Sequence, residues 1–327
     1  MYNEITFLVI IIYVLAELKG IDCSVGDTYP TYRSCVTECT KSTCESDGIS
    51  YVSTIRIKWY LRLLWNCRDN CEYECIWPMV RICLKKGWEI PQFSGKWPFI
   101  RWLGMQEPAS VIFSILNLIS SIYMYNQFRK AVRTPFTMYW IWTVYAGVSS
   151  NAWIWSVVFH IRDIPFTERM DYISASTLVY YTFYAFGYRM IIFQKLFTKV
   201  LFVCGCLFFF VQHTLHLIMK PFDYHYNFDT LVFVGILTGV TTLLWCLWNW
   251  NIISHVKYAT IYVSLTTIVA LLEVFDFPPV LWVFDAHSMW HLATVPLPYF
   301  IYKFAIEDCR YLRRHTHRST VATVGRS

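Results

Sequence analysis

The sequence predicts an all-α membrane protein, in which a seven-transmembrane helix bundle follows a disulfide-rich lumenal domain. Three observations predict this class. Of the 327 residues, 56% are hydrophobic and only 15% are charged, whereas a soluble domain has about 25% charged residues. Eight of the twelve cysteines precede residue 84. Seven apolar segments follow residue 107, each near the length of about 20 residues that a helix needs to cross a bilayer.

Residues 1–20 predict a secretory signal peptide. Their apolar core, residues 5–16, is short for a membrane span and resembles the central region of a signal sequence. The segment before this core contains Glu4 but neither Lys nor Arg. A retained signal anchor is therefore the alternative interpretation.

Residues 21–107 are polar and rich in cysteine, and we expect a lumenal domain held together by disulfides. An even number of cysteines behind a signal peptide is typical of an oxidising compartment. Because eight cysteines allow roughly a hundred connectivities, no pairing is assigned. Three of them recur every four residues, which places them on one stripe of a helix: Cys67, Cys71 and Cys75. A zinc knuckle is the alternative, although zinc motifs favour shorter Cys-x-x-Cys pairs. The eight residues are Cys23, Cys35, Cys39, Cys44, Cys67, Cys71, Cys75 and Cys83.

The seven apolar segments predict a transmembrane domain over residues 108–306, followed by a basic cytosolic tail over residues 307–327. The predicted spans are residues 108–126, 138–160, 170–188, 198–219, 229–248, 258–275 and 288–306. With the cysteines in the lumen, the first, third and fifth loops and the tail face the cytosol. Those segments carry most of the Arg and Lys, as the positive-inside rule requires. The net charge of +6 is thus explained by cytosolic flanks, without nucleic acid.

Five polar residues lie near the lumenal ends of three predicted spans. Ser156 and His160 are four residues apart at the end of the second span, and Asp171 begins the third. His287 and His291 are four residues apart at the start of the seventh. A spacing of four places each pair on one helix face. Since ionisable groups within a membrane are costly and usually functional, we predict that these residues form one site.

The side chains of this site suit Zn²⁺. Three neutral imidazoles, from His160, His287 and His291, leave a fourth position for water, and zinc lowers the pKa of such a water toward about 7. Asp171 is predicted to accept a proton from the water. Ser156 is predicted to hydrogen-bond a developing oxyanion or to orient the site. A site at this depth can reach the ester carbonyls of a lipid.

Other polar residues receive structural interpretations. Four are predicted to join neighbouring helices by hydrogen bonds: Asn117, Asn151, His213 and His216. Glu107 is predicted to cap the first span, with lining of the site as the alternative. Asp285 either supports a histidine or caps the seventh span. The sequence contains no Gly-rich phosphate loop and no Gly-x-Ser-x-Gly motif, which disfavours nucleotide binding and an α/β-hydrolase mechanism.

Three phrases carry a resemblance to a known family: "QEPASVIFSILN", "NAWIWSVVFHIRD" with "TERMDY", and "DFPPVLWVFDAHSMWHLAT". Together with the Cys-rich segment they resemble the family of post-GPI attachment to proteins factor three over nearly the whole chain. The wider superfamily includes alkaline ceramidases and the progestin and adiponectin receptors. It shares a Ser-x-x-x-His pair, a following Asp and a late His-x-x-x-His pair, which match Ser156, His160, Asp171, His287 and His291.

The resemblance implies remodelling of the lipid of GPI-anchored proteins, by removal of the sn-2 acyl chain from the anchor's phosphatidylinositol. This is zinc-dependent ester hydrolysis of the phospholipase A2 type, in a multi-pass membrane protein of the Golgi or the endoplasmic reticulum. Two alternatives stay open. One is amide hydrolysis of ceramide, against which the Cys-rich domain argues. The other is a receptor or a GPI-protein-binding factor with a structural zinc. The residues alone predict a lumen-facing metallohydrolase of a membrane-soluble substrate.

Overall fold

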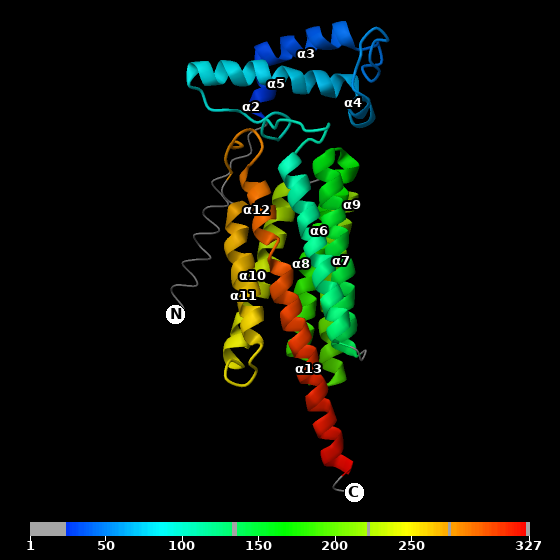
Figure 1. Ribbon diagram of the computed structural model, residues 1–327, viewed down its shortest axis with the longest axis vertical. Helices are drawn as coiled ribbons and strands as arrows, with labels where there is room; N and C mark the ends of the chain where they lie inside the picture. Colours follow the sequence, from blue (N-terminus) through cyan, green and yellow to red (C-terminus); the bar gives the residue numbers. More distant parts are fainter. Residues whose placement is uncertain (1–23, 133–135, 221–222, 274–275, 325–327) are drawn as a thin grey trace. The chain divides into compact units, whose positions relative to one another are not determined.

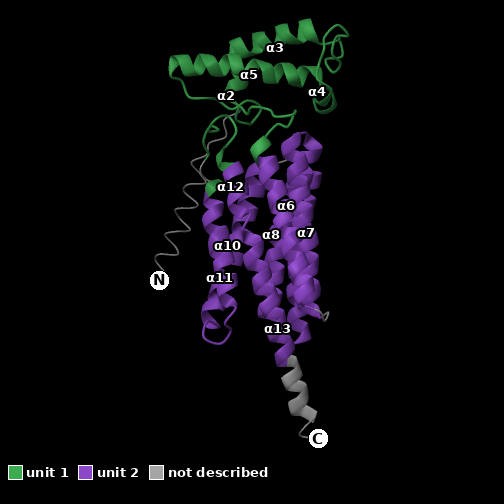
Figure 2. Ribbon diagram, in the orientation of Figure 1, with its two compact units in different colours: residues 1–109, 272–287 green, residues 110–271, 288–327 purple. Residues whose placement is uncertain are grey.

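The computed structural model describes residues 24–132, 136–220, 223–273 and 276–324. Within these ranges the regular elements are helices, together with isolated β-bridges, which confirms the all-α class. The predicted signal peptide lies outside the described residues. The chain forms two compact units (Figure 2): residues 1–109 with 272–287, and residues 110–271 with 288–327.

The first unit is built on two helices, α3 and α5 (Figure 1). Pro30 occupies the first turn of α3, where its missing N–H is not needed. The Asn66 side chain caps α5 by accepting a hydrogen bond of 2.7 Å from the backbone N–H of Asp69. Gly87 ends α5 in the left-handed conformation, with φ of 66°. The helices of this unit are α2 (Val25–Thr28), α3 (Pro30–Thr43), α4 (Trp59–Leu64) and α5 (Cys67–Lys86).

Three successive disulfides join α5 to α3 and to the residue that directly follows it. The pairs are Cys35–Cys75, Cys39–Cys71 and Cys44–Cys67, with Cα–Cα distances of 5.8, 5.7 and 5.5 Å. As the residue number rises along α3 it falls along α5, so the two helices are antiparallel. The predicted disulfide framework is confirmed for these six cysteines, and so is the prediction that Cys67, Cys71 and Cys75 share a helix stripe.

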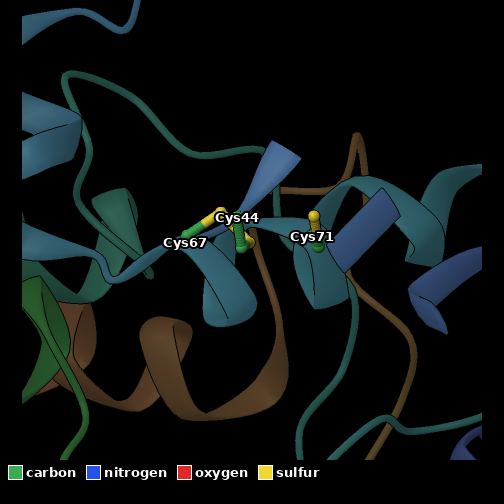
Figure 3. Close-up of side chains that lie close together, drawn as sticks. All are labelled: Cys44, Cys67 and Cys71. Carbon is green, nitrogen blue, oxygen red and sulfur yellow. A yellow bond between two sulfur atoms is a disulfide. The ribbon is translucent and has the colours of Figure 1, made fainter. Parts of the chain in front are cut away.

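Two further observations concern the cysteines of this unit. Cys83 is a buried thiol that packs with Tyr32, and burial raises the pKa of this thiol. Cys23, the remaining cysteine of the eight, lies outside the described residues. Figure 3 shows Cys44, Cys67 and Cys71 close together. Because all three sulfur atoms are in disulfides, they are not the thiolates that a zinc knuckle requires.

Most helices of the second unit run side by side (Figure 1). They are α6 (Pro108–Ala131), α7 (Thr137–Ile161), α8 (Pro165–Met190), α9 (Leu196–Met219), α10 (Tyr224–Trp248), α11 (Val256–Ala270) continued by η1 (Leu271–Glu273), α12 (Ala286–Thr294) and α13 (Leu297–Val324). By length and composition, α6, α9, α10 and the segment Val256–Glu273 are able to cross a membrane. The predicted second and third spans are also helical, as α7 and α8.

Aromatic side chains dominate the core of this unit. The Trp142 ring is fully buried, with its centroid 5.7–6.1 Å from the rings of Tyr145, Phe186 and Phe304. Within the bundle, α8 packs against α7, α9 and α10, while α11 packs against α10 and α13. By contrast, α9 exposes most of its apolar side chains, as expected of a helix that faces lipid rather than water.

The predicted seventh span is not one continuous helix, because it breaks between α12 and α13 at Val295 and Pro296. Proline has no N–H and interrupts helical hydrogen bonding. The N–H of Val295 donates to the carbonyl of Leu292 instead of to the carbonyl of His291. Side chains of α6 supply donors to the carbonyls that the break leaves without helical partners. The Asn117 amide donates to the His291 carbonyl at 2.7 Å, and the Ser120 hydroxyl donates to the Val295 carbonyl at 2.8 Å. The prediction that Asn117 joins helices is thus confirmed. Beyond the break, α13 continues through the predicted tail to Val324.

A buried ionic cluster ties α8, α11 and α13 together. The Asp308 carboxylate, which is fully buried, accepts from Arg189 Nε at 2.6 Å and lies 2.9 Å from His255 Nε2. The Arg189 guanidinium also lies 5.0 Å from the centroid of the Trp245 ring. These contacts hold together helices that are far apart in the sequence.

Asp308→Ala should destabilise the protein strongly, because it leaves the buried Arg189 charge without its carboxylate. Breaking a buried ion pair in this way costs about 3–5 kcal/mol. Glu307→Ala is the matched control, since the pair of Glu307 with Arg310 (2.9 Å) is exposed and such pairs contribute about 0–1 kcal/mol. Thermal unfolding in detergent measures both variants. Equal melting temperatures would contradict a stabilising role for the cluster.

Candidate functional site

Two helices, α7 and α12, bring the predicted histidines together. His160 lies in the last turn of α7 and is 1% exposed, while His291 on α12 is 2% exposed. Their Nε2 atoms are 3.1 Å apart, and their rings meet edge to face with centroids 5.0 Å apart. His287 precedes His291 by one turn on α12, a continuous helix that crosses the boundary between the two units. The three imidazoles offer ligand atoms that all lie within 4.8 Å of one another.

This arrangement fits a divalent transition metal. Imidazole is a ligand of zinc, copper, iron and nickel. A tetrahedral ion with metal–nitrogen bonds of about 2.0–2.1 Å holds two nitrogen ligands about 3.3 Å apart. The separation of 3.1 Å between the Nε2 atoms of His160 and His291 is close to that value. The described residues therefore contain the donor set of a three-histidine metal site, and the spacing of one nitrogen pair matches it.

Glu273, at the end of η1, orients His287. Its carboxylate oxygens lie 2.9 and 3.2 Å from His287 Nδ1, which leaves Nε2 as the ligand atom of this ring. Metal-binding histidines commonly donate their second N–H to a carboxylate in this way. Burial lowers the pKa of His287, but the charge and hydrogen bond of Glu273, together with the charges of Asp285 and Glu107, raise it to about 9.

Glu273 was assigned no role from the sequence. A signal was present, because a carboxylate ends an apolar span at the same predicted depth as the histidines. The sequence does not predict the backbone conformation of residues 276–284, which lead the chain back to the start of α12. In this return Leu281 and Trp282 have φ of 57° and 60°, values that bulky residues seldom adopt.

Ser156 lies one turn before His160 on α7 and is 5% exposed. Its hydroxyl is 2.9 Å from the hydroxyl of Ser114 on α6, a contact that sequence reasoning missed. The rings of Trp153 and Trp290 lie 5.6 and 4.9 Å from the His291 ring. Aromatic rings therefore pack against the His291 side chain. Electrostatic interactions are stronger in such an apolar, low-dielectric environment than in water.

Asp171 is half-buried in the second turn of α8 and does not belong to the group of three ligand residues. Its predicted role as a proton acceptor stays a prediction. Asp285, immediately before α12, is buried, and its charge helps to raise the pKa of His287. This favours the interpretation that Asp285 supports a histidine. Glu107, predicted to cap the first span, forms an ion pair with Lys96.

His213 joins two helices by a hydrogen bond, as predicted, whereas His216 contacts the neighbouring helix by ring stacking. His213 Nδ1 on α9 lies 3.4 Å from the hydroxyl of Tyr226 on α10. The His216 ring stacks on the same tyrosine, with centroids 3.8 Å apart. Asn151, which received the same prediction, is instead exposed on α7.

The fold and the site together define a class of protein, an α-helical membrane protein with a group of three histidines, two of them buried. Comparison with known proteins is more specific. Residues 58–309 match the Per1-like family, and the chain belongs to this family.

Several relatives are similar over almost the whole chain. "GPI-specific phospholipase A2-like PGAP3" of Homo sapiens is 39% identical over 294 residues, which cover 90% of this chain and 92% of that protein. The Xenopus laevis protein of the same name is 38% identical and covers 93% of this chain and 96% of its own. "Post-GPI attachment to proteins factor 3" of Drosophila melanogaster is 35% identical, with coverage of 86% and 87%. No solved structure matches the chain.

Purified protein should contain about one divalent metal ion per chain, as three-histidine sites do. We expect His160→Ala and His291→Ala each to lose it, because two imidazoles hold such an ion weakly. His225→Ala is the matched control, since His225 is exposed on α10 and outside the group. Elemental analysis by mass spectrometry measures the content. Metal retained in both site variants would exclude this site.

Proposed function

We propose that the protein remodels the lipid of GPI-anchored proteins by zinc-dependent hydrolysis of the sn-2 acyl ester of the anchor's phosphatidylinositol. The observation that carries the proposal is the group of His160, His287 and His291, in which His160 and His291 are buried and His287 is partly exposed. It occurs in a member of the Per1-like family whose relatives bear the names of GPI-specific phospholipase A2-like proteins. A helical membrane protein is also suited to a substrate that stays in the bilayer.

In the proposed reaction, water attacks the ester carbonyl, the bond to the glycerol oxygen breaks, and a free fatty acid and a lysolipid leave. His160, His287 and His291 would hold Zn²⁺, which supplies a Lewis acid and lowers the pKa of bound water. Glu273 accepts from His287 Nδ1 and thereby selects the tautomer in which Nε2 carries the lone pair that would bind the ion.

The remaining groups act on the reacting atoms. The Asp171 carboxylate accepts the proton of the attacking water and returns it to the glycerol oxygen that departs. The Ser156 hydroxyl donates to the carbonyl oxygen as its negative charge develops. Ser114, 2.9 Å from Ser156, accepts or donates the second hydrogen bond of that hydroxyl and positions it.

We further propose that the site faces the lumen of the Golgi or the endoplasmic reticulum, where residues 1–20 direct the chain. The disulfides between α3 and α5 support this orientation, because they form and persist in oxidising compartments. The end of α13 then lies in the cytosol. Its Arg310, Arg313 and Arg314 agree with the positive-inside rule.

Asp171→Asn should separate metal binding from catalysis. The variant keeps its metal, because the three imidazoles are intact, but loses activity by about 10²–10⁴-fold, the usual contribution of a general base. Asp229→Asn is the control, since Asp229 is exposed on α10. The assay measures the release of fatty acid from a diacyl GPI lipid, with ceramide as a parallel substrate. Normal turnover by Asp171→Asn would refute the assigned role, and a preference for ceramide would refute the proposed substrate.

Glu273→Gln should weaken zinc binding by about 10–100-fold, the usual effect of removing a carboxylate that supports a ligand. The amide can still hydrogen-bond His287, but it no longer carries the charge that favours the N–H on Nδ1. Competition with a chromogenic chelator measures the affinity. Glu168→Gln is the control, because this acid lies in the first turn of α8. If wild-type protein binds zinc and Glu273→Gln binds it equally well, the supporting role of Glu273 is wrong and the site itself stands.

A further inference from the structure

The first unit exposes four large apolar side chains that we call the α4 patch: Trp59, Leu63, Trp102 and Leu103. Trp59 and Leu63 lie one turn apart on the same face of α4, and each is 76% exposed. Trp102 and Leu103 follow in the turn that precedes α6, and each is 56% exposed. Single exposed apolar residues are common, whereas a group of this size marks an interaction site.

Packing holds the patch in place. The indole N–H of Trp65 donates to the Gly104 carbonyl at 2.8 Å, which binds the turn to the end of α4. A Cβ on Gly104 would come within 3.0 Å of Leu64, so the two segments are in close contact. The Arg101 guanidinium lies 3.2 Å from the centroid of the Trp65 ring. Leu103 has φ of 51° and Gly104 has φ of 83°, and this tight turn presents Trp102 and Leu103 outward.

The short connection to α6 keeps the turn that contains Trp102 and Leu103 near the membrane. Leu103 is five residues before Pro108, where α6 begins. At about 3.5 Å per residue, this segment spans at most about 18 Å. The 24 residues of α6 extend about 36 Å, somewhat more than the bilayer hydrocarbon of about 30 Å. The start of α6 therefore lies at the membrane boundary, and the turn lies within that short reach of it.

The composition of the patch suits the same boundary. Tryptophan gathers where lipid headgroups meet hydrocarbon, because its ring is apolar and its N–H is polar. Lys58 directly precedes α4, and Arg62 lies in the last turn of this helix. Cations beside an apolar face attract lipid phosphates in interfacial helices.

We propose that the α4 patch inserts into the headgroup region of the bilayer that α6 crosses, and that it anchors the disulfide-linked unit to the membrane surface. The occupant of the patch is thus lipid rather than a second copy of the chain. The proposal is independent of the histidine site and of the reaction assigned to it.

Photolabelling of the full-length protein in liposomes tests this anchor. The liposomes contain phosphatidylcholine with a diazirine in the upper part of its acyl chain, and mass spectrometry then locates lipid adducts on peptides. We expect adducts on the peptides that contain Trp59, Leu63, Trp102 and Leu103, as on those of α6. Leu84 and Trp88 form the internal control, since they are 58% and 46% exposed at the opposite end of α5 (Figure 1). They should carry few adducts.

The double variant Trp59→Ser, Leu63→Ser should reduce the adducts on Trp102 and Leu103 severalfold, because the patch inserts as one surface, and should leave those on α6 unchanged. Leu84→Ser is the matched control and should change neither. Non-reducing peptide mapping verifies that all variants keep the Cys35–Cys75, Cys39–Cys71 and Cys44–Cys67 bonds.

Two outcomes would overturn the proposal. In the first, the patch peptides carry no adducts while those of α6 do. In the second, cross-linking of a mixture of light and heavy isotope-labelled chains gives Lys58–Lys58 links between chains, and the patch peptides carry no lipid adducts. This result would identify a second copy of the chain as the occupant.

Discussion

A helix that breaks inside an apolar bundle leaves carbonyl groups that need new hydrogen-bond donors, and the histidine site is built around this constraint. The break at Pro296 frees the carbonyls of His291 and Val295 from their usual partners. Asn117 and Ser120 on α6 supply the donors. An unpaired buried carbonyl would cost about 1–3 kcal/mol. The same bonds that satisfy the backbone therefore set the position of α12, and with it the His291 ring, against α6 and α7.

Two polar clusters of the protein differ in what they can bind. In the first, Asp308 accepts from Arg189 and contacts His255, so opposite charges neutralise one another within the protein. In the second, two imidazoles direct Nε2 atoms at each other across 3.1 Å, with a third imidazole close by. Nitrogens that converge on one point are arranged to share a cation. The charges of the first cluster are paired within the protein, so this cluster stabilises the fold. The second cluster has the donor atoms that a metal site would use.

The periodicity of the sequence predicted features that lie within a single helix, such as its extent and the residues that share a face. Hydropathy indicated the helices of the bundle, and spacings of four placed Cys67, Cys71 and Cys75 on one stripe and His287 and His291 on one face. The pairing of cysteines was beyond such reasoning, because it depends on the antiparallel arrangement of two helices. The helix break was missed although Pro296 is visible in the sequence, since the span was judged by its apolar length. Whether Asp171 serves the site depends on contacts between helices, which spacing does not supply.

Glu273 shows most clearly how the site depends on backbone geometry as well as on its histidines. It precedes His287 by fourteen residues, and its carboxylate reaches Nδ1 only because residues 276–284 return the chain to α12. That return passes through left-handed conformations at Leu281 and Trp282, and the Trp282 ring packs edge to face on Trp77 at 5.8 Å. A strained conformation persists where surrounding packing holds it. The disulfide-linked unit, through Trp77 on α5, thus contributes to the orientation of a histidine. The orientation of His287 therefore depends on a carboxylate and on a packed loop, neither of which belongs to the five residues of the predicted pattern.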